Sequence, residues 1–216
     1  MNTGNRFKIR ELIYKDLVNV ADIHLLAFPD SVLSQLGRKI IIKYYVWQLN
    51  PPNECLAVGA YEAEEMAGFC FSGVFSDAEV HFVIRNWYLT VPILLKKPSL
   101  FRQIDPIKRL SYIFKALVKN LYSQQQKTHV LETGLKKYGI LSIAVAPNYQ
   151  RSGVGRLLME RVYVDARDKG HNQIRLSVHQ DNNQAVQFYE KEGWTKYLDD
   201  TNKWSGVMIK KLGIEE

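Results

Sequence analysis

The feature of this 216-residue chain that most restricts its fold is a strand pattern that passes through a short loop into a helix pattern. Gly139–Ala146 is apolar and predicts a strand, whereas Ser152–Lys169 carries apolar residues at helical spacing. The loop between them, Gln150–Arg156, has glycine at positions 153 and 155. A loop of this kind leaves the first N–H groups of the helix without partners, so the sequence predicts an anion site there.

Strand and helix patterns on both sides of this unit predict one α/β domain over residues 1–216, with a mixed central sheet flanked by helices. The expected strands are Phe7–Glu11, Cys55–Tyr61, Met66–Phe75, Gly139–Ala146, Ile174–His179, Trp194–Leu198 and Val207–Leu212. The expected helices are Asp16–Phe28, a single helix from Ser31 to Leu49, Ser152–Lys169 and Asn183–Glu192, the last with Gly193 after its end. Strands joined by a helical crossover should be parallel, and hairpins should be antiparallel.

The composition argues against several classes of protein. Hydrophobic residues make up 46% and charged residues 24% of the chain, which is typical of a globular domain and not of a disordered one. Apolar stretches are interrupted well before the roughly 20 residues that a membrane span needs, and no signal-peptide pattern is present. Cys55 and Cys70 are too few for a disulfide framework or a metal site. We therefore expect a cytoplasmic protein without a metal.

Basic residues are concentrated between the third and fourth expected strands. The segment from Arg85 to Lys137 contains eleven Lys and Arg and two acidic residues, which gives it a net charge of +9. Because the net charge of the whole chain is +7, the remaining residues carry −2. Apolar residues recur there at helical spacing, which predicts a basic helical insertion at about 80–137. It could bind an anionic acceptor, lie weakly on an anionic membrane surface, or form solvated helices or a homodimer contact. No nucleic-acid recognition motif accompanies the charge, so we expect no nucleic-acid partner.

The glycine-containing loop by itself indicates either an anion site or a plain turn. Gly153 and Gly155 would let anion oxygens approach the backbone closely. Arg151 and Arg156 would add charge-assisted contacts. A dinucleotide-binding fingerprint would need a third glycine where Leu158 stands, and a P-loop would need Lys and then Ser or Thr after its last glycine.

Two motifs in this order resemble the GNAT acetyltransferase superfamily. The first, Gln-Arg-x-Gly-x-Gly over Gln150–Gly155, follows the strand residues Ile143–Val145 and is similar to the acyl-CoA motif of that family. The second, over Asn182–Trp194, looks like the family's Asn-x-x-Ala-x-x-x-Tyr-x-x-x-Gly-aromatic segment. The resemblance is close over residues 139–196 and absent over 76–138.

The resemblance implies a binding site for acetyl-CoA. Backbone groups of Ile143, Ala144 and Val145 would pair with the pantetheine arm. The pyrophosphate would lie against the loop residues Gln150, Arg151, Ser152, Gly153, Val154, Gly155 and Arg156. Tyr189 would lie near the sulfur and protonate the departing thiolate, since a phenol of pKa about 10 suits a thiol of pKa near 8.5; otherwise it is a core aromatic. Asn182 would contact the pantetheine or only cap the last helix.

Acetyl transfer to an amine also needs a base, because a protonated ammonium cannot attack. Some relatives carry Glu where this chain has Ser177, which is a poor base. His179 is one candidate base, since it should share a strand face with Ser177 and its ordinary pKa of about 6.5 is suitable. Glu79 or His81, at the end of the third expected strand, is another. A chain of water molecules without a single base is the remaining alternative.

The motifs together predict an N-acetyltransferase that moves an acetyl group from acetyl-CoA to a primary amine by direct attack. A backbone N–H near Val145 would stabilise the tetrahedral intermediate. The expected acceptor is an amino sugar or another small amine, which is anionic if the basic insertion binds it. A protein N-terminus or lysine is the second acceptor class. A non-catalytic acyl-CoA-binding module stays open because Ser177 replaces the acid.

Overall fold

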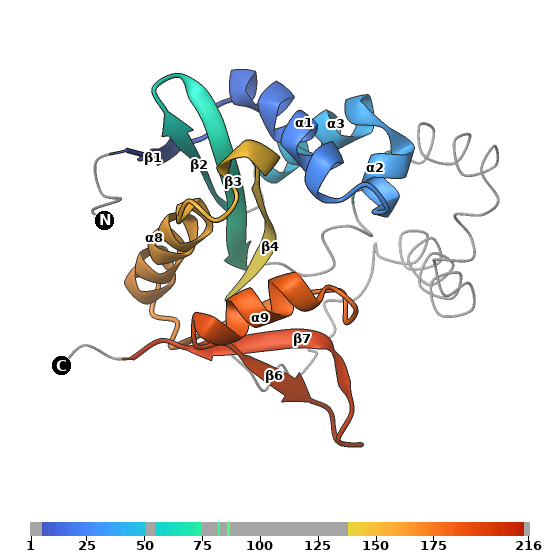
Figure 1. The fold of residues 1–216 in the computed structure, drawn as a ribbon, viewed down its shortest axis with the longest axis vertical. Helices are drawn as coiled ribbons and strands as arrows, with labels where there is room; N and C mark the ends of the chain where they lie inside the picture. Colours follow the sequence, from blue (N-terminus) through green and yellow to red (C-terminus); the bar gives the residue numbers. More distant parts are fainter. Residues whose placement is uncertain (1–5, 51–54, 75–81, 83–85, 87–137, 214–216) are drawn as a thin grey trace, which may run out of the picture.

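In the described part of the chain, seven strands form one mixed sheet, as the sequence predicts, and the structure gives their order as β1-β2-β3-β4-β5-β7-β6 (Figure 1). The computed structural model describes residues 6–50, 55–74, 82, 86 and 138–213. The strands are β1 (Lys8–Glu11), β2 (Cys55–Glu62), β3 (Glu65–Val74), β4 (Tyr138–Val145), β5 (Gln173–Ser177), β6 (Thr195–Leu198) and β7 (Trp204–Lys211). The helices are α1 (Leu17–Ala27), α2 (Val32–Leu36), α3 (Arg38–Gln48), α8 (Val154–Asp168) and α9 (Asn183–Lys191), with 3-10 turns η2 (Tyr14–Asp16) and η3 (Pro147–Tyr149).

The strand directions agree with the prediction. β4 and β5, which α8 connects, are parallel, and the other neighbouring strands are antiparallel. The helical insertion predicted at about 80–137 lies outside the described residues, apart from Phe82 and Asn86. Phe82 is buried against α3, with its ring centroid 5.2 Å from that of Tyr44.

Several predicted boundaries were wrong, and the last strand begins at Trp204 instead of Val207. The single helix expected from Ser31 to Leu49 is two helices, because Gly37 has a φ of +94°, which a right-handed helix cannot include. Ser31 does cap α2, since its hydroxyl oxygen accepts the N–H of Ser34. The strand expected to reach His179 ends at Ser177, and the chain then turns into α9.

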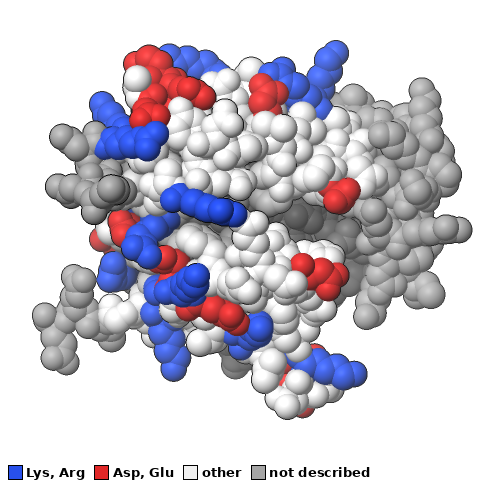
Figure 2. Space-filling model, in the orientation of Figure 1, with Lys and Arg blue, Asp and Glu red and all other residues white. Residues whose placement is uncertain are grey.

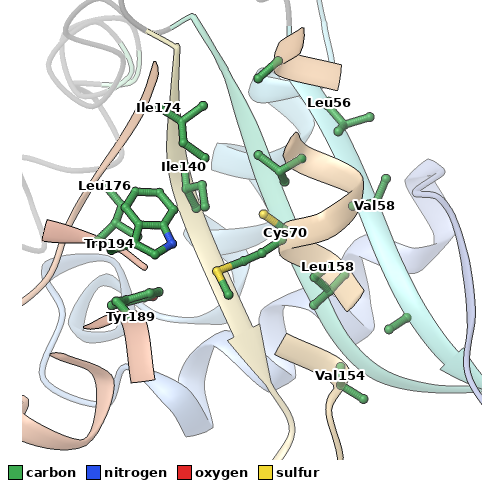
Figure 3. Close-up of a cluster of buried hydrophobic side chains, with 14 of the residues drawn as sticks. Leu56, Val58, Cys70, Ile140, Val154, Leu158, Ile174, Leu176, Tyr189 and Trp194 are labelled. Atoms are coloured by element: carbon green, nitrogen blue, oxygen red, sulfur yellow. The ribbon is translucent and has the colours of Figure 1, made fainter. Parts of the chain in front are cut away.

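The sheet has buried side chains on both faces. In β3, Phe69 and Phe71 belong to the core beneath α1, α2 and α3, whereas Cys70 between them belongs to the core beneath α8 and α9. Figure 3 shows the second core, where Cys70 of β3 lies close to Leu158 of α8 and Ile140 of β4. The two layers of helices hold the sheet, and therefore the end of β4, in place.

β4 separates from β5 soon after it begins. It pairs with β3 along its length but with β5 only at Tyr138 and Gly139. The register with β3 shifts between Phe71 and Ser72, and this leaves Leu141 as an extra residue in β4. A bulge of this kind bends a strand and increases its twist. The remainder of β4 therefore has one edge that β5 does not cover.

A buried hydrogen-bond chain connects α1 and α3 to β4. The hydroxyl of Tyr45 donates to Ser142 Oγ at 3.0 Å and lies 2.9 Å from His24 Nδ1. His24 Nε2 lies 3.3 Å from the hydroxyl oxygen of Ser31. Burial lowers the pKa of His24 to about 4, so the imidazole is neutral at pH 7. The chain thus holds two helices against the strand through neutral polar groups.

This burial predicts a pH dependence of stability. Between about pH 6.5 and pH 4, His24 binds a proton in the unfolded chain but not in the native protein, so the free energy of unfolding falls as the pH falls. The loss should reach roughly 2 to 3 kcal/mol by pH 4.5. Urea unfolding at pH 7 and pH 4.5 measures it, with His24→Gln as the comparison. Between pH 7 and pH 4.5, the free energy of unfolding of the variant should fall by roughly 2 to 3 kcal/mol less than that of the wild type. An equal fall in both proteins would contradict a neutral, buried His24.

Candidate active site

The loop after β4 has the backbone geometry of an anion site. Arg151 and Gly153 have φ of +62° and +91°, and the residues between and beside them have negative φ. Successive residues with φ of alternating sign turn their N–H groups toward one concave space. Among the described residues, the N–H groups of residues 153–156 have no hydrogen-bond acceptor, and Gly153 provides no capping side chain. The start of α8 therefore presents a set of free donors together with the positive end of the helix dipole.

Glycine permits the close packing that places this loop beside β4 and α9. A Cβ on Gly155 would lie 3.2 Å from Phe188 Cζ and 3.8 Å from Val145 Cγ2, so the start of α8 contacts both elements. A Cβ on Gly68 of β3 would lie 2.7 Å from the carbonyl oxygen of Ala144. Larger residues at these two positions would push the end of β4 and the start of α8 out of place.

The uncovered edge of β4 carries backbone groups that can bind a ligand. The N–H of Ala146 donates to the carbonyl of Ala67 in β3, so Ala144 also faces β3. By the alternation of a strand, Ile143 and Val145 turn their N–H and C=O groups to the other edge. No described strand pairs with that edge beyond the first two residues of β4. Of the three predicted pantetheine contacts, the structure thus places two on the open edge and one, Ala144, on the paired edge.

The polar side chains of the loop differ in what they contact. Arg156 pairs with Glu192 after α9, with Nη2 2.6 Å from Oε1, so its charge is already matched. The hydroxyl of Ser152 donates to the carbonyl of Tyr149 and stabilises the turn. Arg151 is exposed and has no ion pair within the described part of the chain. Arg151 is therefore the arginine whose charge remains for an anion.

The second motif places Asn182 and Tyr189 on α9. Asn182 Oδ1 accepts the N–H of Ala185 at 3.1 Å, which is the capping role that the sequence left open. Tyr189 is 8% exposed and packs against Trp194, with ring centroids 5.9 Å apart, as Figure 3 shows. Burial raises the pKa of the Tyr189 phenol above its ordinary value, so the hydroxyl keeps its proton at neutral pH. Its hydroxyl has no hydrogen-bond partner among the described residues.

The structure gives little support to His179 as a base. Its side chain is 78% exposed and lies in the turn after β5, where Nδ1 accepts the N–H of Asp181. Ser177 ends β5 and is exposed. Glu79 and His81 lie outside the described residues, so their role stays a prediction.

The sequence analysis missed the chain of His24, Tyr45 and Ser142. The available signal was Ser142, a polar residue within the apolar stretch Leu141–Ala146, because a polar group in a buried strand requires a partner.

The surface is hollowed between the part that contains α2 and the part that contains α9, as Figure 2 shows. The described surface beside this hollow is mostly uncharged, whereas Lys, Arg, Asp and Glu lie mixed over α8. In the described part of the chain, no group of three or more His, Cys, Asp or Glu could hold a metal ion. None of the described helices combines the length and the apolar character needed to cross a membrane.

Comparison with known proteins identifies the family. The model of the acetyltransferase (GNAT) family matches residues 17–194, which is most of the chain. The protein therefore belongs to the GNAT acetyltransferase family. This confirms the family, the mixed sheet and the enzyme class, an N-acetyltransferase, that the two motifs implied. A comparison with curated proteins finds no match.

Solved structures share the fold at low sequence identity. The ribosomal-protein-S18-alanine N-acetyltransferase of Escherichia coli is 17% identical, with a TM-score of 0.54 over 97% of this chain and 96% of that one. The PaiA N-acetyltransferase of Thermoplasma acidophilum, solved with coenzyme A, is 15% identical, with a TM-score of 0.55 over 95% and 98%. A ribosomal-protein-alanine N-acetyltransferase of Brucella melitensis is 14% identical, with a TM-score of 0.54 over 95% and 99%. At these identities the similarity shows the fold alone.

Proposed function

We propose that the protein transfers an acetyl group from acetyl-CoA to a primary amine by direct attack. The observation that carries this proposal is the pairing of two ligand surfaces, the open edge of β4 at Ile143 and Val145 and the free N–H groups at the start of α8. The first suits an extended amide-containing arm and the second suits a pyrophosphate. The two surfaces adjoin at Gly155, where a Cβ would lie 3.8 Å from Val145 Cγ2. Acetyl-CoA has both chemical features in one molecule.

Each residue of the site has a role in this reaction. The N–H groups of Ile143 and Val145 orient the donor along β4, and one of them can donate to the carbonyl oxygen as it becomes negative. Arg151 and the loop backbone hold the pyrophosphate. Tyr189 keeps its proton at neutral pH and can give it to the departing thiolate. Trp194 holds the Tyr189 ring in position through ring contact.

The acceptor is the less determined part of the proposal. We infer a small amine such as an amino sugar, and the basic segment at about 80–137 favours one that also carries an anionic group, such as a nucleotide-linked amino sugar. That segment lies almost entirely outside the described residues, and its membrane and homodimer alternatives stay predictions. The ribosomal-protein-alanine acetyltransferases among the similar structures make a protein N-terminus the second acceptor to test.

Release of coenzyme A in the presence of amines tests the function. Purified protein with acetyl-CoA should release free thiol with at least one member of a panel containing amino sugars, nucleotide-linked amino sugars, polyamines, and peptides with a free N-terminus or lysine. Acetylation of the acceptor is confirmed by mass. Tight binding of acetyl-CoA without thiol release from any amine would instead favour the non-catalytic binding module.

Gly153→Glu should abolish binding of coenzyme A. The new carboxylate would occupy the concave loop and repel the pyrophosphate, and the left-handed φ of this position disfavours any side chain. Calorimetric titration with coenzyme A measures the loss, which should exceed about 100-fold since several charged contacts are removed together. Gly170→Glu is the matched control, because Gly170 has a φ of +77° at the other end of α8 and open space around it. Unchanged affinity in Gly153→Glu refutes the loop assignment.

Tyr189→Phe should lower kcat while leaving the affinity for coenzyme A and the melting temperature nearly unchanged. The ring and its packing on Trp194 remain, and only the proton donor is lost, an effect of roughly 100-fold for a general acid. Steady-state kinetics, calorimetry and thermal unfolding measure the three quantities. Full turnover in the variant would reduce Tyr189 to a core aromatic.

A further inference from the structure

The hydrogen-bond chain begins at Ser142 of β4, beside the open-edge residues of the proposed site, and ends at Ser31 before α2. Ser142 is partly exposed, Tyr45 is 0% exposed and His24 is 4% exposed. From Ser142 the chain passes through the Tyr45 hydroxyl and the His24 ring to Ser31, whose hydroxyl donates in turn to Ser34 Oγ at 3.0 Å. Ser31 and Ser34 are both partly exposed. The hydrogen-bond chain therefore crosses a buried layer and has partly exposed groups at both of its ends.

In the proposed binding mode, the side chain of Ser142 lies next to the place where the acceptor amine would react. It follows the bulge at Leu141 and directly precedes the open-edge residues Ile143 and Val145. The pyrophosphate loop follows the other end of β4, so a donor extended along this edge passes Val145, then Ile143, and then reaches Ser142. The Ser142 side chain lies on the face of the sheet that α3 covers, since Tyr45 of α3 bonds to it.

We propose that Ser142, Tyr45 and His24 form a relay that carries the proton of the acceptor amine from the site to the surface at Ser31. This inference rests on the proposed acetyl transfer. It assigns Ser142 as the group that contacts the amine and gives Tyr45 and His24 a positioning and transfer role. It also accounts for the base that the sequence left without a residue.

The protons of the reaction balance with this route. An ammonium acceptor loses two N–H protons while the C–N bond forms and the C–S bond breaks. Tyr189 donates one proton to the sulfur, and it is then reprotonated by the amine or by solvent. The second proton must leave the protein. Each group of the relay accepts one proton and donates another, so that a proton is released to water at Ser31. No group of the relay carries a net charge after the transfer.

The neutral imidazole of His24 permits this proton transfer. A neutral imidazole accepts a proton at one nitrogen and releases one from the other, and both nitrogens of His24 face a hydroxyl. The titratable group that faces it is Tyr45 of α3, with Ser31 on the other side and the ring of Phe28 against it. Burial is the cause of its lowered pKa, so the ring is neutral before and after each transfer at pH 7.

Outward transfer requires the hydroxyl hydrogens of Tyr45 and Ser142 to turn away from their resting direction first. Tyr45 donates toward Ser142 in the structure, which leaves a lone pair of Ser142 Oγ for the N–H of the amine. Hydroxyl protons rotate about the C–O bond and His24 has two tautomers. Once Ser142 has turned to donate to Tyr45, and Tyr45 to His24 Nδ1, with the His24 proton on Nε2, the sequence of donors runs from the amine through Ser142, Tyr45 and His24 to Ser31.

The same contacts would also serve as a purely structural tie between α1, α3 and β4, and a matched set of variants distinguishes the two roles. Tyr45→Phe and Ser142→Ala each remove one hydroxyl from the chain. Ser142→Ala is the safer variant for folding because it alters a small, partly exposed side chain. Tyr138→Phe is the control, since Tyr138 is also a buried tyrosine whose hydroxyl has two partners, Ser72 and Asp165, but it lies at the other end of β4.

The test measures kcat for glucosamine, or for the most active amine of the panel, between pH 6 and pH 10. Both relay variants should lose roughly 100-fold at pH 7 and recover as the pH approaches the pKa of the amine, which then enters as the neutral form. Their affinity for coenzyme A should be unchanged, and the Tyr138→Phe control should keep the wild-type profile. Wild-type kinetics in both relay variants, or the same loss in the control, overturns the relay and leaves the acetyl transfer intact. A wild-type protein inactive with every amine refutes the proposed function and the relay with it.

A measurement without substrates tests the connection itself. Imidazole 15N NMR of the free protein should show a neutral His24 at pH 7. Ser142→Ala removes the Ser142 oxygen as an acceptor for the Tyr45 hydroxyl, which should then donate to His24 Nδ1 more often, so the tautomer with the proton on Nε2 should increase. A cationic His24 at pH 7, or nitrogen shifts that Ser142→Ala leaves unchanged, contradicts the relay.

Discussion

The extra residue at Leu141 bends β4 away from β5, and backbone N–H and C=O groups beyond the bend have no strand to pair with on that side. An unpaired edge in the middle of a sheet is costly unless a ligand or solvent satisfies it. The site depends on this constraint, because the bend opens the edge at Ile143 and Val145 and directs the end of β4 into the loop that begins α8. The core on each face of β4 stabilises the bend by fixing Ile140 and Ala144.

Local patterns were sufficient to predict most of the fold. The seven strands, the parallel pair and the turn at Gly193 follow from residues close in sequence, and the Trp194 N–H bonds to the Tyr189 carbonyl as a C-terminal glycine turn requires. The break at Gly37 was missed because apolar spacing continues across it. The bulge at Leu141 could not be predicted, since it arises from the register with β3 and not from the composition of β4.

The candidate site was predicted only where its residues are close together in the sequence. Loop residues 150–156 are contiguous, so their joint presence at a helix start follows from the sequence alone. The hydroxyl of Ser142 meets that of Tyr45 across 97 positions, a contact that only the packing of α3 on the sheet creates. Arg156 was expected to contact an anion, but Glu192 from the second motif already pairs with it. Residues that act through long-range contacts therefore required the structure.

Amide hydrogen exchange with and without acetyl-CoA tests the central claim most directly, which is that the open edge of β4 and the start of α8 bind one ligand together. On addition of acetyl-CoA, the amides of Ile143 and Val145 and those of residues 153–156 should slow together, because free donors become hydrogen-bonded. The amide of Ala144 should change little, since it already faces β3. Protection elsewhere, with these amides still exchanging freely, would contradict the account.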